Sequence, residues 1–154
     1  MRIQLALNVR NLDAAIDFYS KLFGVGVNKR KPGYANFAID APPLKLVLFE
    51  APDAPERLNH LGVEVFDGSD VDRASARIQA AGLPHLVQDD TTCCYAKQKK
   101  VWATDPDGAR WEWYRVLEDA ETFGAEPESV PAAEAAEPEA AGVCGPARVA
   151  PCCG

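Results

Sequence analysis

The sequence predicts an α+β fold in which two βαβββ modules build one curved mixed sheet. Two observations carry this prediction. First, a strand-like segment, a helical segment and three short strand-like segments follow one another twice along the chain. Second, equivalent points of the two copies are offset by similar spacings, 56 residues for Gln4 and His60 and 58 residues for Gly24 and Gly82. The composition, 47% hydrophobic and 25% charged, is ordinary for a globular protein.

The first copy begins with alternating polar and apolar residues over 2–9, the pattern of a strand with one buried face. Asn11 is suited to cap the next helix, because its side-chain oxygen can accept a backbone hydrogen bond from the first turn. Apolar residues then recur at helical spacing from Leu12 to Phe23, and Gly24 is suited to end the helix. We expect three short strands after it, over 26–30, 34–39 and 44–50.

The second copy repeats this order. Residues 59–66 alternate like a strand, residues 67–70 offer capping side chains, and a helix is expected to run to Ala81 and end at Gly82. Further strands are expected over 85–88, 95–103 and 109–116. Asp105-Pro106-Asp107-Gly108 predicts the turn before the last strand, since proline presets one backbone angle and glycine accepts a positive φ.

From Glu118 onward the chain is rich in alanine, glutamate and proline, a composition with little to bury. We therefore predict one domain over 1–117, with modules over about 1–51 and 58–117, and a disordered tail over 118–154. The net charge of −7 lies in this tail, which holds eight acidic residues and one basic residue. The first 117 residues hold 15 of each, so we expect no general attraction to nucleic acid or to anionic lipid.

No apolar run reaches the roughly 18 residues of a membrane span, and the N-terminus begins with a strand pattern rather than a signal peptide. The sequence predicts a cytoplasmic protein whose thiols stay reduced, and the odd number of five cysteines argues against a disulfide framework. Lys97, Lys99 and Lys100 are expected to form a solvated strand face.

Three polar residues fall on the strand faces opposite the predicted helices. Alternation places Gln4, His60 and Glu112 on this face, each in a different strand. If both modules share one curved sheet, the three side chains can converge, and a nitrogen, a carboxylate and an amide oxygen suit a divalent transition metal. The alternative is a set of polar residues on an exposed sheet face. His85, the second histidine, is expected at the surface or at a strand start.

Cys93 and Cys94 are adjacent thiols within Asp89-Asp90-Thr91-Thr92-Cys93-Cys94-Tyr95, and we expect them on a loop. Neighbouring cysteines rarely bond to each other, because the ring would be strained. Two thiolates can instead hold one soft atom, such as zinc, copper(I), cadmium or trivalent arsenic. The alternative is a pair of small buried apolar side chains. Cys144, Cys152 and Cys153 lie in the tail, where they are either accessory thiols for a metalloid or dispensable.

Two segments resemble the vicinal-oxygen-chelate superfamily, which includes glyoxalases, bleomycin resistance proteins and extradiol dioxygenases. They are the opening residues 5–19, LALNVRNLDAAIDFY, and the closing residues 105–112, DPDGARWE. The resemblance covers about 1–117 and implies metal ligands at Gln4, His60 and Glu112. The fourth equivalent position falls near Val47, which is apolar, so that corner is expected to be open to other ligands.

Further motifs resemble the cadmium-induced and organoarsenical-cleaving branch of this superfamily. They are residues 31–39, 42–48, 59–65 and 91–96, the last being the TTCCYA segment. This resemblance implies an Fe(II)-dependent dioxygenase that cleaves the carbon–arsenic bond of trivalent organoarsenicals, with Cys93 and Cys94 holding arsenic. It implies O₂ as co-substrate, other divalent metals as possible substitutes for iron, and a monomer or a homodimer.

Two other functions stay open. The chain could be a non-enzymatic protein that sequesters cadmium or arsenite through its thiols, or it could be a glyoxalase-type or extradiol-type enzyme. The small ligand set and the missing second metal-binding histidine weigh against the latter two. Neither of those enzymes accounts for Cys93 and Cys94.

Overall fold

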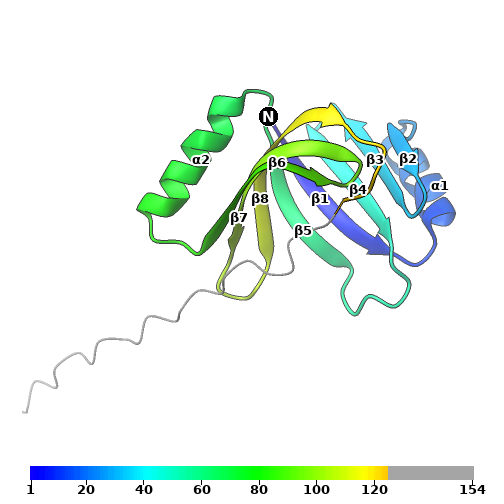
Figure 1. The fold of residues 1–154 in the computed structure, drawn as a ribbon. Coiled ribbons are helices and arrows are strands. Elements are labelled where there is room, and N and C mark those ends of the chain that lie inside the picture. Colours follow the sequence, from blue (N-terminus) through cyan, green and yellow to red (C-terminus); the bar gives the residue numbers. More distant parts are fainter. Residues whose placement is uncertain (125–154) are drawn as a thin grey trace, which may run out of the picture.

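The computed structural model describes residues 1–124, and it contains the two βαβββ modules that the sequence predicts (Figure 1). The predicted tail begins at Glu118, and its residues 125–154, with Cys144, Cys152 and Cys153, lie outside the described residues. The first module comprises β1 (Arg2–Val9), α1 (Leu12–Phe23), β2 (Lys29–Lys31), β3 (Tyr34–Ile39) and β4 (Leu44–Glu50). The second comprises β5 (Leu58–Glu64), α2 (Gly68–Ala80), β6 (His85–Cys93), β7 (Ala96–Thr104) and β8 (Arg110–Asp119).

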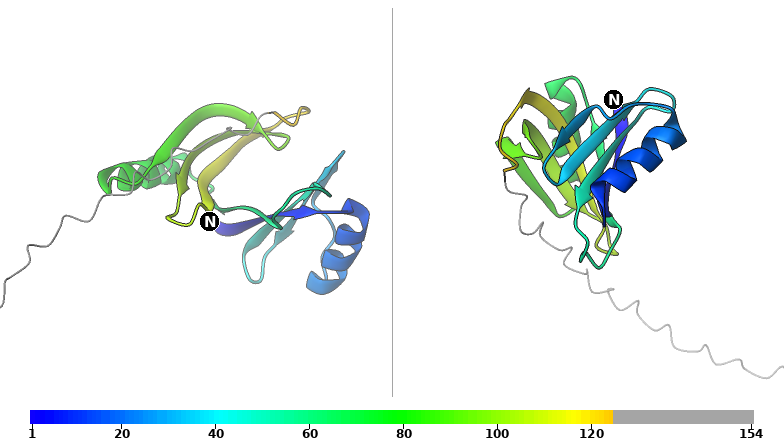
Figure 2. Two further views of the ribbon diagram at one scale, coloured as in Figure 1. Left: turned by 90° about the horizontal axis from the view of Figure 1, so that it is seen from below. Right: turned by 90° about the vertical axis from the view of Figure 1, so that its right-hand side faces the viewer.

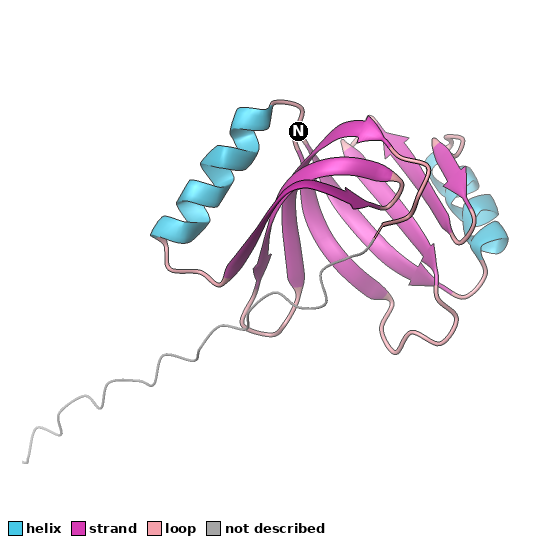
Figure 3. Ribbon diagram, viewed as in Figure 1, coloured by secondary structure: helices cyan, strands magenta, loops and turns pink. Residues whose placement is uncertain are grey.

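All eight strands form one mixed sheet in the order β2-β3-β4-β1-β5-β8-β7-β6. The modules meet where β1 pairs antiparallel with β5, and each module has one parallel pair, β1 with β4 and β5 with β8. The sheet is strongly curved, as the two views of Figure 2 show. The two helices lie at opposite ends of this sheet (Figure 3), so its central strands keep a concave face that no helix covers.

Local chemistry sets the helix ends where the sequence predicts them. The Asn11 side chain accepts a hydrogen bond from the Ala14 backbone nitrogen at 2.8 Å, and Gly24 ends α1 with φ +66°. Asp67 caps α2 by accepting from the Ser69 nitrogen at 2.9 Å. Within residues 1–124 no helix is long and apolar enough to cross a membrane.

Each helix packs on its own module and forms a separate core. Leu12 and the apolar face of α1 cover Phe37, Leu46 and Leu48, while α2 covers Val63, Val65 and Val101. Ile3, on the same face of β1 as Leu5 and Leu7, is half exposed. A third cluster of apolar side chains lies between the modules and comprises Ala6, Tyr34, Val47, Phe49 and Tyr95, with Cys94 packed against it.

The predicted strand boundaries hold best in the first module. β3 and β4 have the predicted bounds, whereas β2 begins three residues later than expected. β6 runs to Cys93 rather than ending at Gln88, because it continues past an irregularity between Gln88 and Thr91. β8 continues three residues past its predicted end, to Asp119.

A buried ion cluster joins the modules beside the site described below. The Glu64 carboxylate of β5 accepts hydrogen bonds from the Lys45 ammonium of β4, at 2.9 Å, and from the Arg2 guanidinium of β1. Burial raises the pKa of Glu64, but Lys45 and Arg2 outweigh burial and hold this pKa below its ordinary value. The cluster therefore carries its stabilising charge at neutral pH.

Replacing Glu64 with glutamine is expected to destabilise the fold by about 3 kcal/mol, because two cations lose their shared buried partner. Since the folded-state pKa of Glu64 is lowered, its contribution exists above the ordinary pKa of 4.5 and is lost as the pH falls below it. Urea unfolding at pH 7 and pH 4 measures both effects. The exposed Glu121→Gln variant is the control, and equal stability of both variants at pH 7 would refute the prediction.

Candidate metal and thiol site

The three predicted metal ligands meet on the concave face. Gln4 of β1, His60 of β5 and Glu112 of β8 are each at most 4% exposed. The Gln4 Nε2 atom lies 2.9 Å from His60 Nε2 and 2.6 Å from Glu112 Oε1, and His60 Nε2 lies 3.2 Å from the same carboxylate oxygen. Strand alternation and register produce this convergence, because Gln4 pairs with Gly62, and Gly62 pairs with Glu112.

Hydrogen bonds orient the His60 ring toward the centre of this triad. His60 Nδ1 lies 2.7 Å from the Asn59 side-chain oxygen, which can only accept, so Nδ1 carries the proton. His60 Nε2 then accepts a hydrogen bond from the Gln4 amide nitrogen, which also donates to Glu112 Oε1. His60 Nε2 and Glu112 Oε1, two atoms that each carry a lone pair, thus lie 3.2 Å apart at the centre of the triad. A bound cation would be stabilised by both.

The donor set fits a divalent metal. Metal–ligand bonds of about 2.1 Å at right angles separate neighbouring ligand atoms by about 3 Å, close to the three separations given above. Gln4 Oε1 accepts from the Tyr114 hydroxyl, and rotating the amide by half a turn would bring that oxygen to the metal, with Tyr114 accepting from the amide nitrogen. Within residues 1–124, no three His, Cys, Asp or Glu side chains form a metal-binding group, so a metal here requires the Gln4 amide.

Val47 supplies no ligand atom. It is buried beside Ala6 on the same face, in the cluster between the modules. The corner at Val47 therefore offers no ligand atom beside the three predicted ligands, Gln4, His60 and Glu112. His85 begins β6, and its Nδ1 atom lies 2.9 Å from the Leu83 carbonyl oxygen, away from the triad.

Lys100 is the residue of this site that sequence analysis missed. Its ammonium is 1% exposed and donates to Glu112 Oε2 at 2.8 Å, so the prediction of a solvated face is wrong for Lys100. Burial raises the pKa of Glu112, but the neighbouring Lys100 and His60 together outweigh burial and hold this pKa well below its ordinary value. Alternation along β7 contained the signal, because Lys100 shares a face with Trp102 whereas Lys97 and Lys99 point the other way.

Cys93 ends strand β6 and Cys94 begins the β6–β7 turn, whereas both were expected on a loop. Cys93 pairs with Ala96, so Cys94 and Tyr95 form a two-residue turn with φ values of +56° and +60°. This turn type favours Asn-Gly, and holding other residues there costs about 1–3 kcal/mol each. The turn places both sulfur atoms 2.9 Å apart, and the two cysteines form no disulfide.

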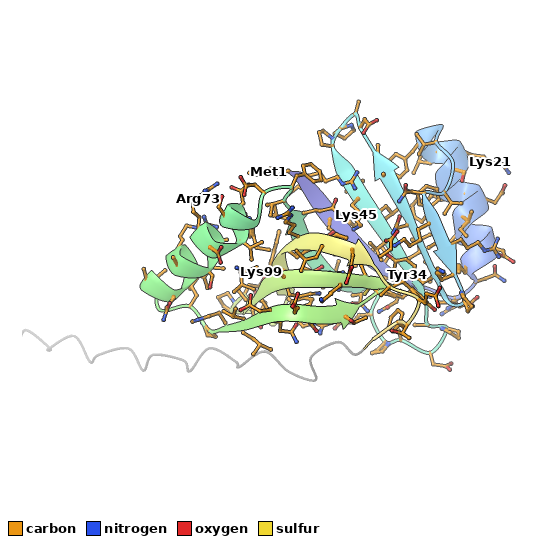
Figure 4. The ribbon with its side chains drawn as sticks, turned by 45° about the horizontal axis from the view of Figure 1, so that its top comes forward. Met1, Lys21, Tyr34, Lys45, Arg73 and Lys99 are labelled. Carbon is orange, nitrogen blue, oxygen red and sulfur yellow. The ribbon has the colours of Figure 1, made fainter. Side chains whose placement is uncertain are left out.

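Packing from three directions holds this strained turn. The Tyr95 ring contacts Tyr34 and Phe123, with centroid distances of 5.6 and 5.5 Å, and its carbonyl accepts from the Ala120 nitrogen at 2.9 Å. Figure 4 shows Tyr34 beside the tip of the hairpin and Lys45 over the middle of the sheet, far from Lys21 and Arg73 on the helices. Cys94 packs against the cluster that contains Ala6 and Val47, two residues of the concave face that also holds the triad.

The two thiols are electrostatically linked to the triad. A hydrogen bond with Cys93, followed by burial, raises the pKa of the Cys94 thiol well above its ordinary value. Lys100 acts in the opposite direction on Cys94, and Glu112 adds to the rise. Lys100 is thus close enough to influence both the predicted metal ligands and the predicted arsenic ligands.

Gly62 sets the spacing of the triad. A Cβ atom added at Gly62 would lie 2.9 Å from the Glu112 Cγ and 3.4 Å from the Gln4 Cβ. Gly62→Ala is therefore expected to displace Glu112, to weaken Fe(II) binding by about tenfold or more, and to cost about 1–3 kcal/mol of stability. Gly26→Ala is the matched control, since nothing lies within 4 Å of its added Cβ. Anaerobic Fe(II) titration and urea unfolding check both effects, and unchanged Fe(II) affinity in Gly62→Ala would contradict them.

Comparisons with known proteins identify relatives with high sequence identity to this chain. It is 50% identical over 153 residues to a trivalent organoarsenical cleaving enzyme of Thermomonospora curvata, covering 99% of each chain. It is 59% identical over 126 residues to the cadmium-induced protein CadI of Mycobacterium tuberculosis, covering 82% of this chain and 83% of the relative.

A solved structure and a family model give the same fold. The Mn(II)-bound glyoxalase of Novosphingobium aromaticivorans matches with a TM-score of 0.54 and 22% identity, covering 84% of this chain and 43% of that chain. A model described as the Glyoxalase/Bleomycin resistance protein/Dioxygenase superfamily matches residues 3–113. As the sequence motifs indicated, the chain belongs to the glyoxalase/bleomycin resistance protein/dioxygenase superfamily.

Proposed function

We propose that this protein is an Fe(II)-dependent dioxygenase that cleaves the carbon–arsenic bond of trivalent organoarsenicals. The observation that carries the proposal is the presence of two adjacent thiols, 2.9 Å apart, together with a Gln4–His60–Glu112 triad on one concave face. The names of three relatives, two called trivalent organoarsenical cleaving enzymes and one called a probable trivalent organoarsenical cleaving enzyme, support the substrate class.

Cys93 and Cys94 capture the substrate through its arsenic atom. For methylarsenite the step is CH₃As(OH)₂ + 2 RSH → CH₃As(SR)₂ + 2 H₂O, so two S–As bonds replace two O–As bonds. The raised pKa of Cys94 is compatible with this step, because each thiol proton leaves with an arsenic hydroxyl as water. The strained turn holds both sulfur atoms close together, so the second S–As bond forms within the same molecule after the first.

Gln4, His60 and Glu112 would hold the metal beside the captured arsenical. Fe(II) bound there would supply the binding and activation of O₂. The overall reaction, CH₃As(OH)₂ + O₂ → As(OH)₃ + HCHO, balances without an external reductant, since the methyl carbon gives up four electrons and arsenic stays trivalent. Asn59 fixes the His60 tautomer, as described above.

Lys100 has two effects on this site. By donating to Glu112 Oε2 at 2.8 Å, it leaves Oε1 to face the triad and favours single-oxygen ligation by Glu112. Its positive charge also offsets the negative charge of the carboxylate in a buried position, where unpaired charge is costly. The aromatic rings of Trp102 and Phe49 flank His60, with centroid distances of 5.2 and 6.2 Å, and limit access of water.

The second candidate function is sequestration of a soft metal or metalloid without cleavage. The thiol pair and the 59% identity to a protein named for induction by cadmium favour it. Under this alternative the buried triad would have no chemical role. The two functions therefore differ in whether Gln4, His60 and Glu112 are needed.

Product analysis distinguishes the two functions. The reduced protein is loaded with Fe(II) without oxygen, methylarsenite is added, air is admitted, and arsenic species and formaldehyde are measured. We expect arsenite and formaldehyde in equal amounts, only with Fe(II) and O₂ present. Methylarsenite that is bound in a stoichiometric amount but never cleaved would refute the proposal and favour sequestration.

A further inference from the structure

A β-bulge places the Asn59 side chain beside that of its chain neighbour, His60. Successive residues of a regular strand point to opposite faces of the sheet, so their side chains do not normally meet. The pairing of β1 with β5 shifts register here, because Ala6 pairs with His60 whereas Leu7 pairs with Leu58, which leaves Asn59 as the extra residue. The bulge allows the Asn59 side-chain oxygen to lie 2.7 Å from His60 Nδ1.

Asn8 of β1 fixes which end of the Asn59 amide faces His60. The Asn8 side chain lies 3.0 Å from the backbone carbonyl oxygen of Glu56, which can only accept, so the Asn8 atom facing it is the amide nitrogen. The remaining Asn8 oxygen accepts a hydrogen bond from the Asn59 amide nitrogen at 2.9 Å. The Asn59 oxygen is therefore left to face His60 Nδ1, which must carry the proton.

Arg110 favours the same orientation of the Asn59 amide. A guanidinium has only donors, and the Arg110 Nη2 atom lies 3.3 Å from the Asn59 oxygen. A reversed Asn59 amide would point its nitrogen at Arg110 and its oxygen at the Asn8 oxygen, so both hydrogen bonds would be lost. The backbone of Asn8 is itself held in place, because its nitrogen donates to the Arg57 carbonyl oxygen at 2.8 Å and its carbonyl accepts from the Arg57 guanidinium at 3.2 Å.

We propose that Asn8 is a positioning residue for the metal site, because through the Asn59 amide it keeps the His60 proton on Nδ1 and leaves Nε2 available to the metal. The inference rests on the proposed function, in which His60 is a metal ligand. Without this control, Glu112 would favour the wrong tautomer, since its Oε1 atom lies 3.2 Å from His60 Nε2 and would accept a hydrogen bond from a proton there. Removing a group that orients a metal-binding histidine typically weakens metal binding by about 10–100-fold.

Nitrogen NMR of the metal-free, full-length chain in mildly alkaline buffer reads the tautomer of His60, because protonated and unprotonated ring nitrogens have different chemical shifts. The chain has two histidines, so the His85→Ala variant assigns the remaining signals to His60. We expect the natural chain to carry the His60 proton on Nδ1. In Asn8→Leu the Asn59 amide is free to turn over, so the proton should move to Nε2 in most molecules. Fe(II) affinity, measured by anaerobic titration, should then fall about tenfold, in proportion to the fraction that keeps the proton on Nδ1.

Asn59→Asp provides a rescue that a merely structural role of Asn8 would not give. A carboxylate accepts through both oxygens, so it keeps the proton on His60 Nδ1 whichever way it is turned. In the Asn59→Asp background, Asn8→Leu should therefore change neither the tautomer nor the Fe(II) affinity. Asn28→Leu is the matched control, because it removes a similar amide pair, Asn28 with Asn36 at 2.8 Å, and Asn36 lies on β3, three strands away from His60 in the sheet.

Asn8→Ala removes the same side-chain oxygen and replaces Asn8→Leu if the latter does not fold. A proton that stays on His60 Nδ1, with unchanged Fe(II) affinity, in the Asn8 variant would overturn the inference. A natural chain with the His60 proton on Nε2 would overturn it as well, as would a loss of Fe(II) affinity that persists in the Asn59→Asp background. If Asn8→Leu moves the proton but the natural chain binds no Fe(II), the proposed function fails while the control of His60 by Asn8 is supported.

Discussion

Replacing either Cys93 or Cys94 with serine is expected to weaken methylarsenite capture by roughly a hundredfold or more and to abolish cleavage, while Fe(II) still binds. A serine hydroxyl is a hard, weak ligand for trivalent arsenic, and a single remaining thiol loses the advantage of closing the second bond within one turn. The sulfur atoms lie only 2.9 Å apart, so neither thiol can be replaced by a more distant group in residues 1–124.

The tail thiols must be removed for this measurement to be clean. Cys152 and Cys153 form a second adjacent pair in the sequence, so the serine variants are made in the chain whose Cys144, Cys152 and Cys153 are already serine. Equal capture by that parent chain and the natural chain at limiting substrate would remove the proposed accessory role of the tail thiols.

Thr92→Ser is the matched control for disturbance of the hairpin, since it changes the neighbouring residue and keeps a hydroxyl. Calorimetric titration with methylarsenite and anaerobic Fe(II) titration are made on each variant. Full capture and turnover by both cysteine variants would refute the arsenic-binding role of the pair.

The fold and the position of the triad could be predicted because both follow from local periodicity. Helix caps at Asn11 and Asp67 and strand alternation are properties of neighbouring residues. Alternation also fixes which face of a strand Gln4, His60 and Glu112 occupy, and two similar modules sharing one sheet bring these faces together. The position of the triad could therefore be predicted without knowing the conformation of any loop.

Other features depend on contacts that no local pattern reveals. The Cys94–Tyr95 turn lacks the Asn-Gly sequence typical of its geometry, because packing of Tyr95 on Tyr34 and Phe123 holds it instead. Lys100 was grouped with its neighbours Lys97 and Lys99, although its partner Glu112 lies on the next strand.

His60→Ala is expected to abolish Fe(II)-dependent cleavage and to weaken Fe(II) binding by more than about a hundredfold, since it removes the one nitrogen ligand of the triad. Methylarsenite capture should persist, because Cys93 and Cys94 belong to a different strand pair.

His85→Ala is the matched control, since the only other histidine contacts the Leu83 carbonyl oxygen away from the site. Anaerobic Fe(II) titration and arsenic speciation after admission of air measure both properties. The proposal predicts that His60→Ala captures methylarsenite without cleaving it and that His85→Ala retains both capture and cleavage. This result would show that the triad is needed for cleavage but not for binding of arsenic by the thiol pair. Unchanged cleavage in His60→Ala would remove the triad from the mechanism.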